Sequence, residues 1–208
     1  MSLVTNWGYT ITDADALADM LTLTEFNTMT ANKYAGDVRI PDNIEAACMA
    51  IRNYVGWHLY PSQACSFSER LLSGDGRIKR AGPDCLVQLP AAYVASVTSV
   101  KVNGETWTDF TYGINGLLRL FDLRCGNRKM EITVTYTAGI PDALMGSVKE
   151  LIAHRVTHAL ASSAGVQSES AGGVSITYSA NWINSSRATA LADDNKEVLA
   201  PFKLREVF

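Results

Sequence analysis

The sequence predicts an α+β protein in which a helical frame carries an inserted, small antiparallel β unit. Three observations lead to this fold class. Residues 42–60 and 142–162 have apolar side chains at three- and four-residue spacing, the pattern of amphipathic helices. Residues 62–137 change to a two-residue period rich in threonine and valine, which indicates strands. Prolines mark both changes, at Pro61 and Pro141.

The same observations predict how the chain is organised. We expect residues 1–61 and 138–208 to form the helical part, with two long antiparallel helices and a C-terminal helix over about 185–200. Residues 62–137 are expected to form the β unit. A chain of 208 residues accommodates one or two domains.

Composition and charge exclude several classes of protein. With 47% hydrophobic and 19% charged residues, the chain has the balance of a globular protein with an apolar core. A net charge of −3 argues against a general nucleic-acid binder. No apolar stretch approaches the ~20 residues of a membrane span, and we see no secretory signal, so no membrane partner is expected.

The cysteines are scattered and include no C-x-x-C pair; they are Cys48, Cys65, Cys85 and Cys125. This spacing argues against a zinc ribbon and gives no sign of a disulfide framework. We therefore expect buried free thiols, as in a protein made in a reducing cytoplasm.

The helix over 42–60 has the clearest pattern. Asp42 followed by Glu45 resembles a capping box, and Pro61 stops the helix. Its buried stripe is predicted to be Ile44, Ala47, Cys48, Ile51, Val55 and Leu59. Aromatic side chains crowd its end, namely Tyr54, Trp57, His58 and Tyr60. Such a cluster is typical of core packing more than of a ligand site.

Turn signals divide the β unit into five or six short strands. Asn103-Gly104 and Asn115-Gly116 are each typical of a hairpin turn. The predicted strands include 86–89, 97–102, a return strand that holds Trp107 and Phe110, and 130–136, in which apolar residues alternate with Glu131, Thr133 and Thr135.

Residues 1–40 give the weakest signals. A short helix is predicted around 13–20, where three aspartates invite comparison with a calcium loop: Asp13, Asp15 and Asp19. An EF-hand loop requires glycine at its sixth position and glutamate at its twelfth. The chain has Ala18 and Thr24 there, so we expect no calcium site.

The stretch over 147–182 is the clearest candidate for partner binding. A helix leads into a polar loop and then into a strand over 174–179, in which apolar and hydroxyl residues alternate. The loop buries little apolar area, so we expect it to be mobile in a monomer and ordered by a partner. The tail after Pro201 is expected to contact a partner too. The candidate partner-binding residues are Ser168, Glu169, Ser170, Gly172, Gly173, Ser175, Ile176, Tyr178, Phe202, Leu204 and Phe208.

Glu150, His154 and His158 form the best enzyme-like constellation, because they are spaced by four residues on one helix face. Two imidazoles one turn apart can share a metal ion with a carboxylate. The spacing lacks the internal glutamate of H-E-x-x-H, and no second cluster of ligands completes a site. We favour a solvated or interfacial helix face and predict no catalytic residue, no metal and no cofactor.

Other chemical motifs are absent or weak. No G-x-S-x-G occurs, and the glycine-rich residues 74–77 lack the lysine–hydroxyl pair of a phosphate loop. Arg77, Lys79 and Arg80 form a small basic cluster beside them. We favour a solvated loop, with a contact to DNA phosphate or to an acidic partner as the alternative.

Three longer stretches occur in a characteristic order. Residues 40–61 are IPDNIEAACMAIRNYVGWHLYP, residues 132–160 are ITVTYTAGIPDALMGSVKELIAHRVTHAL, and residues 165–179 are GVQSESAGGVSITYS. Together with the closing LAPFKLREVF, they resemble the head–tail connector, or adaptor, proteins of tailed bacteriophages. The resemblance covers somewhat under half of the chain and leaves out residues 1–40 and much of the β unit.

The resemblance implies a structural virion protein of the neck, located at the capsid vertex and assembled in the host cytoplasm. Such proteins form a homo-oligomeric ring, commonly of twelve subunits, under the portal protein. The ring bridges the portal to the stopper or tail-completion protein, and double-stranded DNA passes through its channel without specific binding. A mildly acidic chain suits such a channel.

Two other classes stay open. The chain is alternatively another neck or tail-completion protein or a carbohydrate-binding β module, and co-purification with portal protein would argue against these. A metal-dependent enzyme that uses Glu150, His154 and His158 is the other class. Metal analysis of chelator-free protein distinguishes it from a structural protein.

Overall fold

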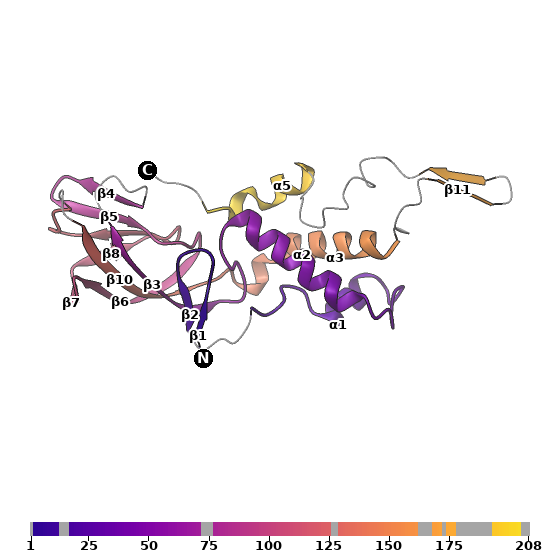
Figure 1. The fold of residues 1–208 in the computed structure, drawn as a ribbon, viewed down its shortest axis with the longest axis horizontal. Coiled ribbons are helices and arrows are strands. Elements are labelled where there is room, and N and C mark those ends of the chain that lie inside the picture. Colours follow the sequence, from indigo (N-terminus) through magenta and orange to yellow (C-terminus); the bar gives the residue numbers. More distant parts are fainter. Residues whose placement is uncertain are drawn as a thin grey trace. The chain divides into compact units, whose positions relative to one another are not determined.

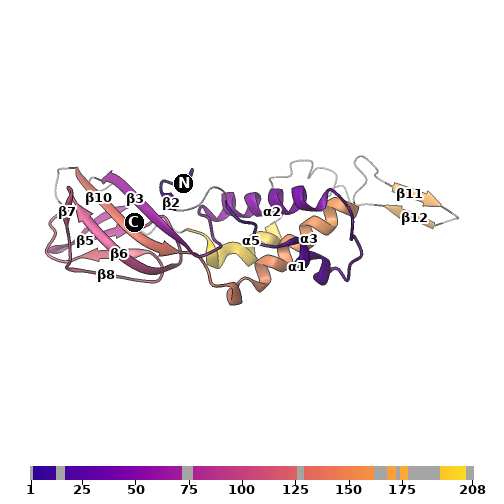
Figure 2. The same ribbon diagram turned by 90° about the horizontal axis from the view of Figure 1, so that it is seen from below.

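The computed structural model describes residues 2–12, 17–71, 77–125, 129–161, 168–171, 174–177 and 193–204. In these residues it has an α+β fold, with four α-helices and two larger antiparallel sheets of six and four strands (Figures 1 and 2). The chain divides into a sheet unit, made of residues 1–18, 55–144 and 200–208, and a helical unit, made of 19–54 and 145–199.

The larger sheet has strand β10 near its centre. Its strands follow the order β1 (Ser2–Val4), β2 (Thr10–Thr12), β3 (Gln63–Leu71), β10 (Met130–Ala138), β6 (Val94–Val102) and β7 (Glu105–Thr106), and all neighbours are antiparallel. Alternation along β10 determines its two faces: Ile132, Val134 and Tyr136 are fully buried, whereas Thr133 and Thr135 between them lie on the opposite face.

The second sheet has the order β4 (Ile78–Ala81), β5 (Asp84–Gln88), β9 (Leu117–Leu120) and β8 (Phe110–Tyr112). Both predicted hairpin turns are confirmed. Asn103 and Gly104 have φ values of 51° and 87°, which suit the tight turn between β6 and β7. Gly116 lies between β8 and β9, where a Cβ atom would lie 2.3 Å from the carbonyl oxygen of Ala91.

The prediction of a small inserted β unit is wrong, because the sheets contain about as much of the chain as the helices. Strands β1 and β2 add residues 2–12 to the larger sheet, where Thr10 pairs with Ser66 of β3. The expected return strand through Trp107 and Phe110 is also wrong. Strand β7 covers two residues, and Phe110 begins β8 in the other sheet.

The helical unit contains α1 (Leu23–Met29), α2 (Ile40–Val55), α3 (Gly146–Ala161) and α5 (Asp193–Leu199), with α2 and α3 next to each other in both views (Figures 1 and 2). The predicted stripe of α2 is buried, including Ile44, Cys48 and Ile51. Helix α3 follows a 3-10 turn, η1 (Asp142–Leu144), and buries Val148 and Ile152. The predicted helix over 142–162 is confirmed, except that it begins at Gly146, after this 3-10 turn.

Both boundaries of helix α2 differ from the prediction. Helix α2 begins at Ile40, so Asp42 lies in its first turn and is not a cap. It ends at Val55, because Gly56 takes the left-handed conformation (φ 82°) that commonly terminates helices. The predicted stripe residue Leu59 therefore lies beyond the helix, although it is fully buried.

The predicted helix around 13–20 is also wrong in the residues that the structure describes there, since residues 17–19 have no regular structure. The first helix instead begins after Thr22. Thr22 accepts a hydrogen bond from the N–H of Glu25, and the Glu25 carboxylate accepts one from the N–H of Thr22. This reciprocal capping box satisfies two backbone N–H donors at the start of α1. A helix that began earlier in the chain would lack this cap.

Candidate partner-binding segments

The predicted loop and strand contain two strands, β11 (Ser168–Ala171) and β12 (Val174–Thr177). They pair antiparallel, with Glu169 opposite Ile176 and Ser170 opposite Ser175. Residues 168–171 were expected to be loop, because serine and glutamate are uncommon in strands. Among the described residues, no third strand joins this hairpin.

The hairpin brings together the backbones of five of the predicted partner-binding residues: Ser168, Glu169, Ser170, Ser175 and Ile176. Four other predicted residues lie outside the part of the chain that the structure describes, namely Gly172, Gly173, Tyr178 and Phe208. The remaining two, Phe202 and Leu204, belong to the sheet unit and are half-buried.

The tail is bound to its own chain as far as Leu204. A short 3-10 turn, η3 (Ala200–Phe202), follows α5. The indole Nε1–H of Trp57 donates to the carbonyl oxygen of Phe202 at 2.8 Å, and the N–H of Leu204 donates to the carbonyl oxygen of Val55 at 2.8 Å. The second bond satisfies a carbonyl at the end of α2. Residues 200–204 therefore help to complete the sheet unit through backbone groups.

The aromatic cluster after α2 is core, as predicted: Trp57 and His58 are fully buried. His58 Nε2 lies 3.1 Å from the carbonyl oxygen of Pro61 and 3.0 Å from that of Ala138. Because carbonyls only accept, Nε2 carries the proton and Nδ1 accepts from the Tyr9 hydroxyl at 2.7 Å. This imidazole thus joins three segments of the sheet unit and has no open position for a ligand.

The helix face with Glu150, His154 and His158 is partly exposed. Glu150 and His154 are exposed and His158 is half-buried, with the two imidazole centroids 6.4 Å apart. Burial, and then the neighbouring His154, lowers the pKa of His158, which favours the neutral ring. Among the described residues, no group of three or more His, Cys, Asp or Glu side chains is placed to hold a metal ion.

The predicted basic cluster does not act as one patch. The Arg77 guanidinium pairs with Glu69 at 3.5 Å, lies over the Phe67 ring at 5.9 Å, and packs beside Gly8. Lys79 and Arg80 are exposed on the edge strand β4, where Arg80 Nε donates to the carbonyl oxygen of Gly82. The Arg77 side chain is therefore engaged within the sheet unit.

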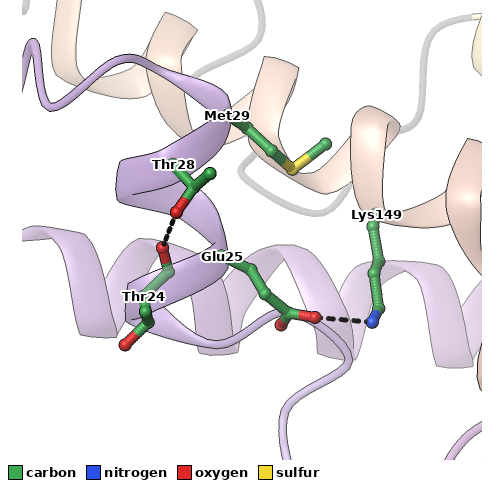
Figure 3. A pocket seen from close by; sticks show the side chains of 5 residues that line it. All are labelled: Thr24, Glu25, Thr28, Met29 and Lys149. Atoms are coloured by element: carbon green, nitrogen blue, oxygen red, sulfur yellow. Dashed lines mark hydrogen bonds and ion pairs between the residues drawn. The ribbon is translucent and has the colours of Figure 1, made fainter.

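A hollow of about 310 Å³ in the helical unit lies between α1 and α3 (Figure 3). It is lined by Thr24, Glu25, Thr28, Met29 and Lys149. Glu25 and Lys149 point toward each other and form an ion pair, and the Thr28 hydroxyl donates to the carbonyl oxygen of Thr24. The two charged groups pair with each other and the Thr28 hydroxyl bonds to its own helix, so the hollow has the features of a helix contact more than of a ligand site.

Sequence reasoning missed one surface of the larger sheet. Register places a set of hydroxyl side chains on the same face across four strands, which we call the hydroxyl face: Thr10, Ser66, Ser68, Ser96, Ser99, Thr133, Thr135 and Thr137. Ser68 Oγ and Thr133 Oγ1 are 2.9 Å apart. Alternation of serine and threonine in β3 and β10 was the available signal. The same register also places Lys101, Arg70 and Glu131 on this face. Because hydroxyls both donate and accept, the face offers hydrogen bonds beside these charges.

The chain matches no protein-family model and no curated protein. None of the helices that the structure describes is both long and apolar enough to cross a membrane.

Proposed function

We propose that this chain is a head–tail connector, or adaptor, of a tailed bacteriophage. In this proposal it is a structural subunit of the neck that forms an oligomeric ring between the portal and the stopper or tail. Helices α2, α3 and α5 form the frame of each subunit, and DNA passes through the ring without specific binding. The proposal begins from the resemblance of residues 40–61, 132–160 and 165–179 to that family.

The hairpin β11–β12 is the structural observation that carries the proposal. A two-stranded hairpin on its own is marginally stable in water. In the part of the chain that the structure describes, no further strand pairs with its outer edges, whose backbone donors and acceptors an added strand from another chain would satisfy. When each subunit presents the same hairpin to the next, the contact is head-to-tail, and such contacts generate a closed ring if the rotation closes.

The turn between β10 and α3 supports the resemblance with a physical reason. Gly139, in the T-A-G sequence that resembles the family, has a φ of 137°. A Cβ atom at this position would lie 2.4 Å from the Cα of Ser62, so only glycine fits where the chain passes this close. The hydroxyl face adds a hydrogen-bonding surface, which suits a subunit that works through protein contacts.

Native mass spectrometry and negative-stain microscopy of the purified chain, with and without portal protein, test the proposal. We expect a ring, alone or on the portal. A chain that stays monomeric with portal present would contradict it. Metal analysis of chelator-free protein tests the enzyme alternative. About one zinc ion per chain, lost in the His154→Ala/His158→Ala double variant, would favour a metalloenzyme.

A further inference from the structure

Two of the four thiols meet inside the sheet unit. Cys85 belongs to β5, where it pairs with Leu120 of β9, and Cys125 follows β9. Their exposed fractions are 0% and 2%. The Cys125 thiol donates weakly to the carbonyl oxygen of Asp84, the residue before Cys85, with its Sγ 3.9 Å from that oxygen, and Cys125 helps to raise the pKa of the Cys85 thiol. The fold therefore places close together two thiols that are far apart in the sequence.

The carboxylate of Asp84 connects the strand that contains Cys85 to the segment that leads to Cys125. The Asp84 carboxylate accepts a hydrogen bond from Arg119 Nε at 2.8 Å and another from the N–H of Asp122 at 3.1 Å. Residues that precede Cys85 and Cys125 are thus fixed to each other independently of the thiols. A disulfide has an S–S length of about 2.05 Å, so oxidation joins two side chains that this anchoring already keeps close together.

The other two cysteines have different neighbours. Cys48 lies in the helical unit, where its sulfur accepts a hydrogen bond from the N–H of Met20. The thiol of Cys65 donates weakly to the carbonyl oxygen of Gln63 at 3.5 Å, and burial raises its pKa to about 12. Both are buried and free, so they serve as internal controls.

We propose that Cys85 and Cys125 are a site of oxidation, at which a small-molecule disulfide such as oxidised glutathione produces an intramolecular disulfide. One protein thiolate attacks a sulfur of the oxidant, forms a mixed disulfide and releases one glutathione thiolate. The second protein thiol then loses its proton and attacks the protein sulfur of that mixed disulfide, which releases the second glutathione. The protein loses two electrons and two protons, and the oxidant becomes two thiols.

Burial sets the rate of this exchange. Burial, and then the adjacent Cys125, raises the pKa of the Cys85 thiol, so little of the reactive thiolate is present at neutral pH. We therefore expect slow oxidation that becomes faster as the pH rises. The reaction needs no second copy of the chain and does not depend on the proposed ring.

The test is incubation of the folded chain with oxidised glutathione at several pH values, followed by alkylation in denaturant, intact mass measurement and peptide mapping. We expect a chain with two alkyl groups instead of four, about 2 Da lighter than a doubly alkylated chain with two free thiols, and a peptide linked through Cys85 and Cys125, with Cys48 and Cys65 alkylated. A Cys48→Ser/Cys65→Ser variant should form the same link, and Cys85→Ser should form none. Circular dichroism confirms that each variant is folded.

Two outcomes would overturn the proposal. One is that Cys85 and Cys125 stay fully alkylatable in the folded Cys48→Ser/Cys65→Ser variant after long incubation at raised pH. The other is that the wild type links all four cysteines in mixed pairings, as a chain oxidised in denaturant does, because selectivity is what the contact between Cys85 and Cys125 produces.

Discussion

Glu25 and Lys149, which are 124 residues apart in the sequence, form an ion pair in the helical unit, with Glu25 Oε1 2.7 Å from Lys149 Nζ (Figure 3). The side chain of Lys149 is 14% exposed and that of Glu25 is 40% exposed. The hydrogen bond from Lys149, and then the bonds from Thr22, lower the pKa of Glu25 to about 2. The same carboxylate therefore caps α1 and joins it to α3.

Replacing Glu25 by Gln should lower the free energy of unfolding by about 1 kcal/mol near neutral pH, since solvent screens this half-exposed pair. Folding lowers the pKa of Glu25 from 4.5 to about 2, so the carboxylate stabilises the fold above pH 4.5. This contribution is lost as the pH falls from 4.5 towards 2. Urea unfolding of both proteins across this range should show a difference that disappears in acid.

The exposed Glu45 of α2 offers a matched control, because Glu45→Gln removes the same charge from the same unit. It should change stability by no more than about 0.5 kcal/mol at any pH. An equal effect of both substitutions would show that net charge, and not the ion pair with Lys149, is responsible.

Replacing His58 by Ala should lower the free energy of unfolding by about 3 kcal/mol, because the substitution leaves a cavity and removes the partner of Tyr9, Pro61 and Ala138. Tyr9→Phe removes both hydrogen bonds of the Tyr9 hydroxyl with His58, at Nδ1 and at the backbone N–H, and should cost about 2 kcal/mol. Thermal unfolding measures both. His154→Ala, at an exposed position, is the control, and a similar loss there would contradict the assigned role of His58.

Ending the chain at Ala200 should lower the free energy of unfolding by about 2 kcal/mol, since the buried indole of Trp57 loses its acceptor and Val55 loses the N–H of Leu204. A chain that ends at Leu204 keeps both hydrogen bonds and is the control. Urea unfolding followed by tryptophan fluorescence compares them. Equal stability of the two truncated chains would mean that these bonds do not stabilise the sheet unit.

Replacing Ile176 by Pro should abolish ring formation and attachment to portal while the helices stay folded, because proline removes a backbone donor and is poorly tolerated inside a strand. Ile176→Val keeps a β-branched residue and should assemble normally. Circular dichroism and a pull-down with portal protein measure the two properties on the same samples. Normal attachment by a folded Ile176→Pro chain would place the interface elsewhere.

The elements with one buried face were predictable from the sequence. Helices α2 and α3 and strand β10 are long enough to show a clear period, because one side of each packs into a core. The two hairpin turns were also predictable, since asparagine and glycine adopt positive φ locally: Asn103 and Gly104 both do so in one turn, and Gly116 does so in the other.

Elements that depend on distant pairing were not predictable. Strands β1 and β2 have three residues each, too few for a period, and β2 is positioned by β3, more than 50 residues later in the chain. The end of α2 depends on tertiary burial of Trp57 and His58 after Gly56. Similarly, β11 has residues that disfavour strands and is defined by its pairing with β12.

The position of β10 in the larger sheet affects how the protein is made. Strands β3 and β6 both pair with β10, yet each is synthesised before β10. The roughly 60 residues between Leu71 and Met130 take about 3–12 s to synthesise at 5–20 residues per second. During that interval the nascent chain has unpaired strand edges and apolar side chains such as Phe67 and Val100. Yield in a foreign host should therefore depend on translation speed and on chaperones that shield these strands.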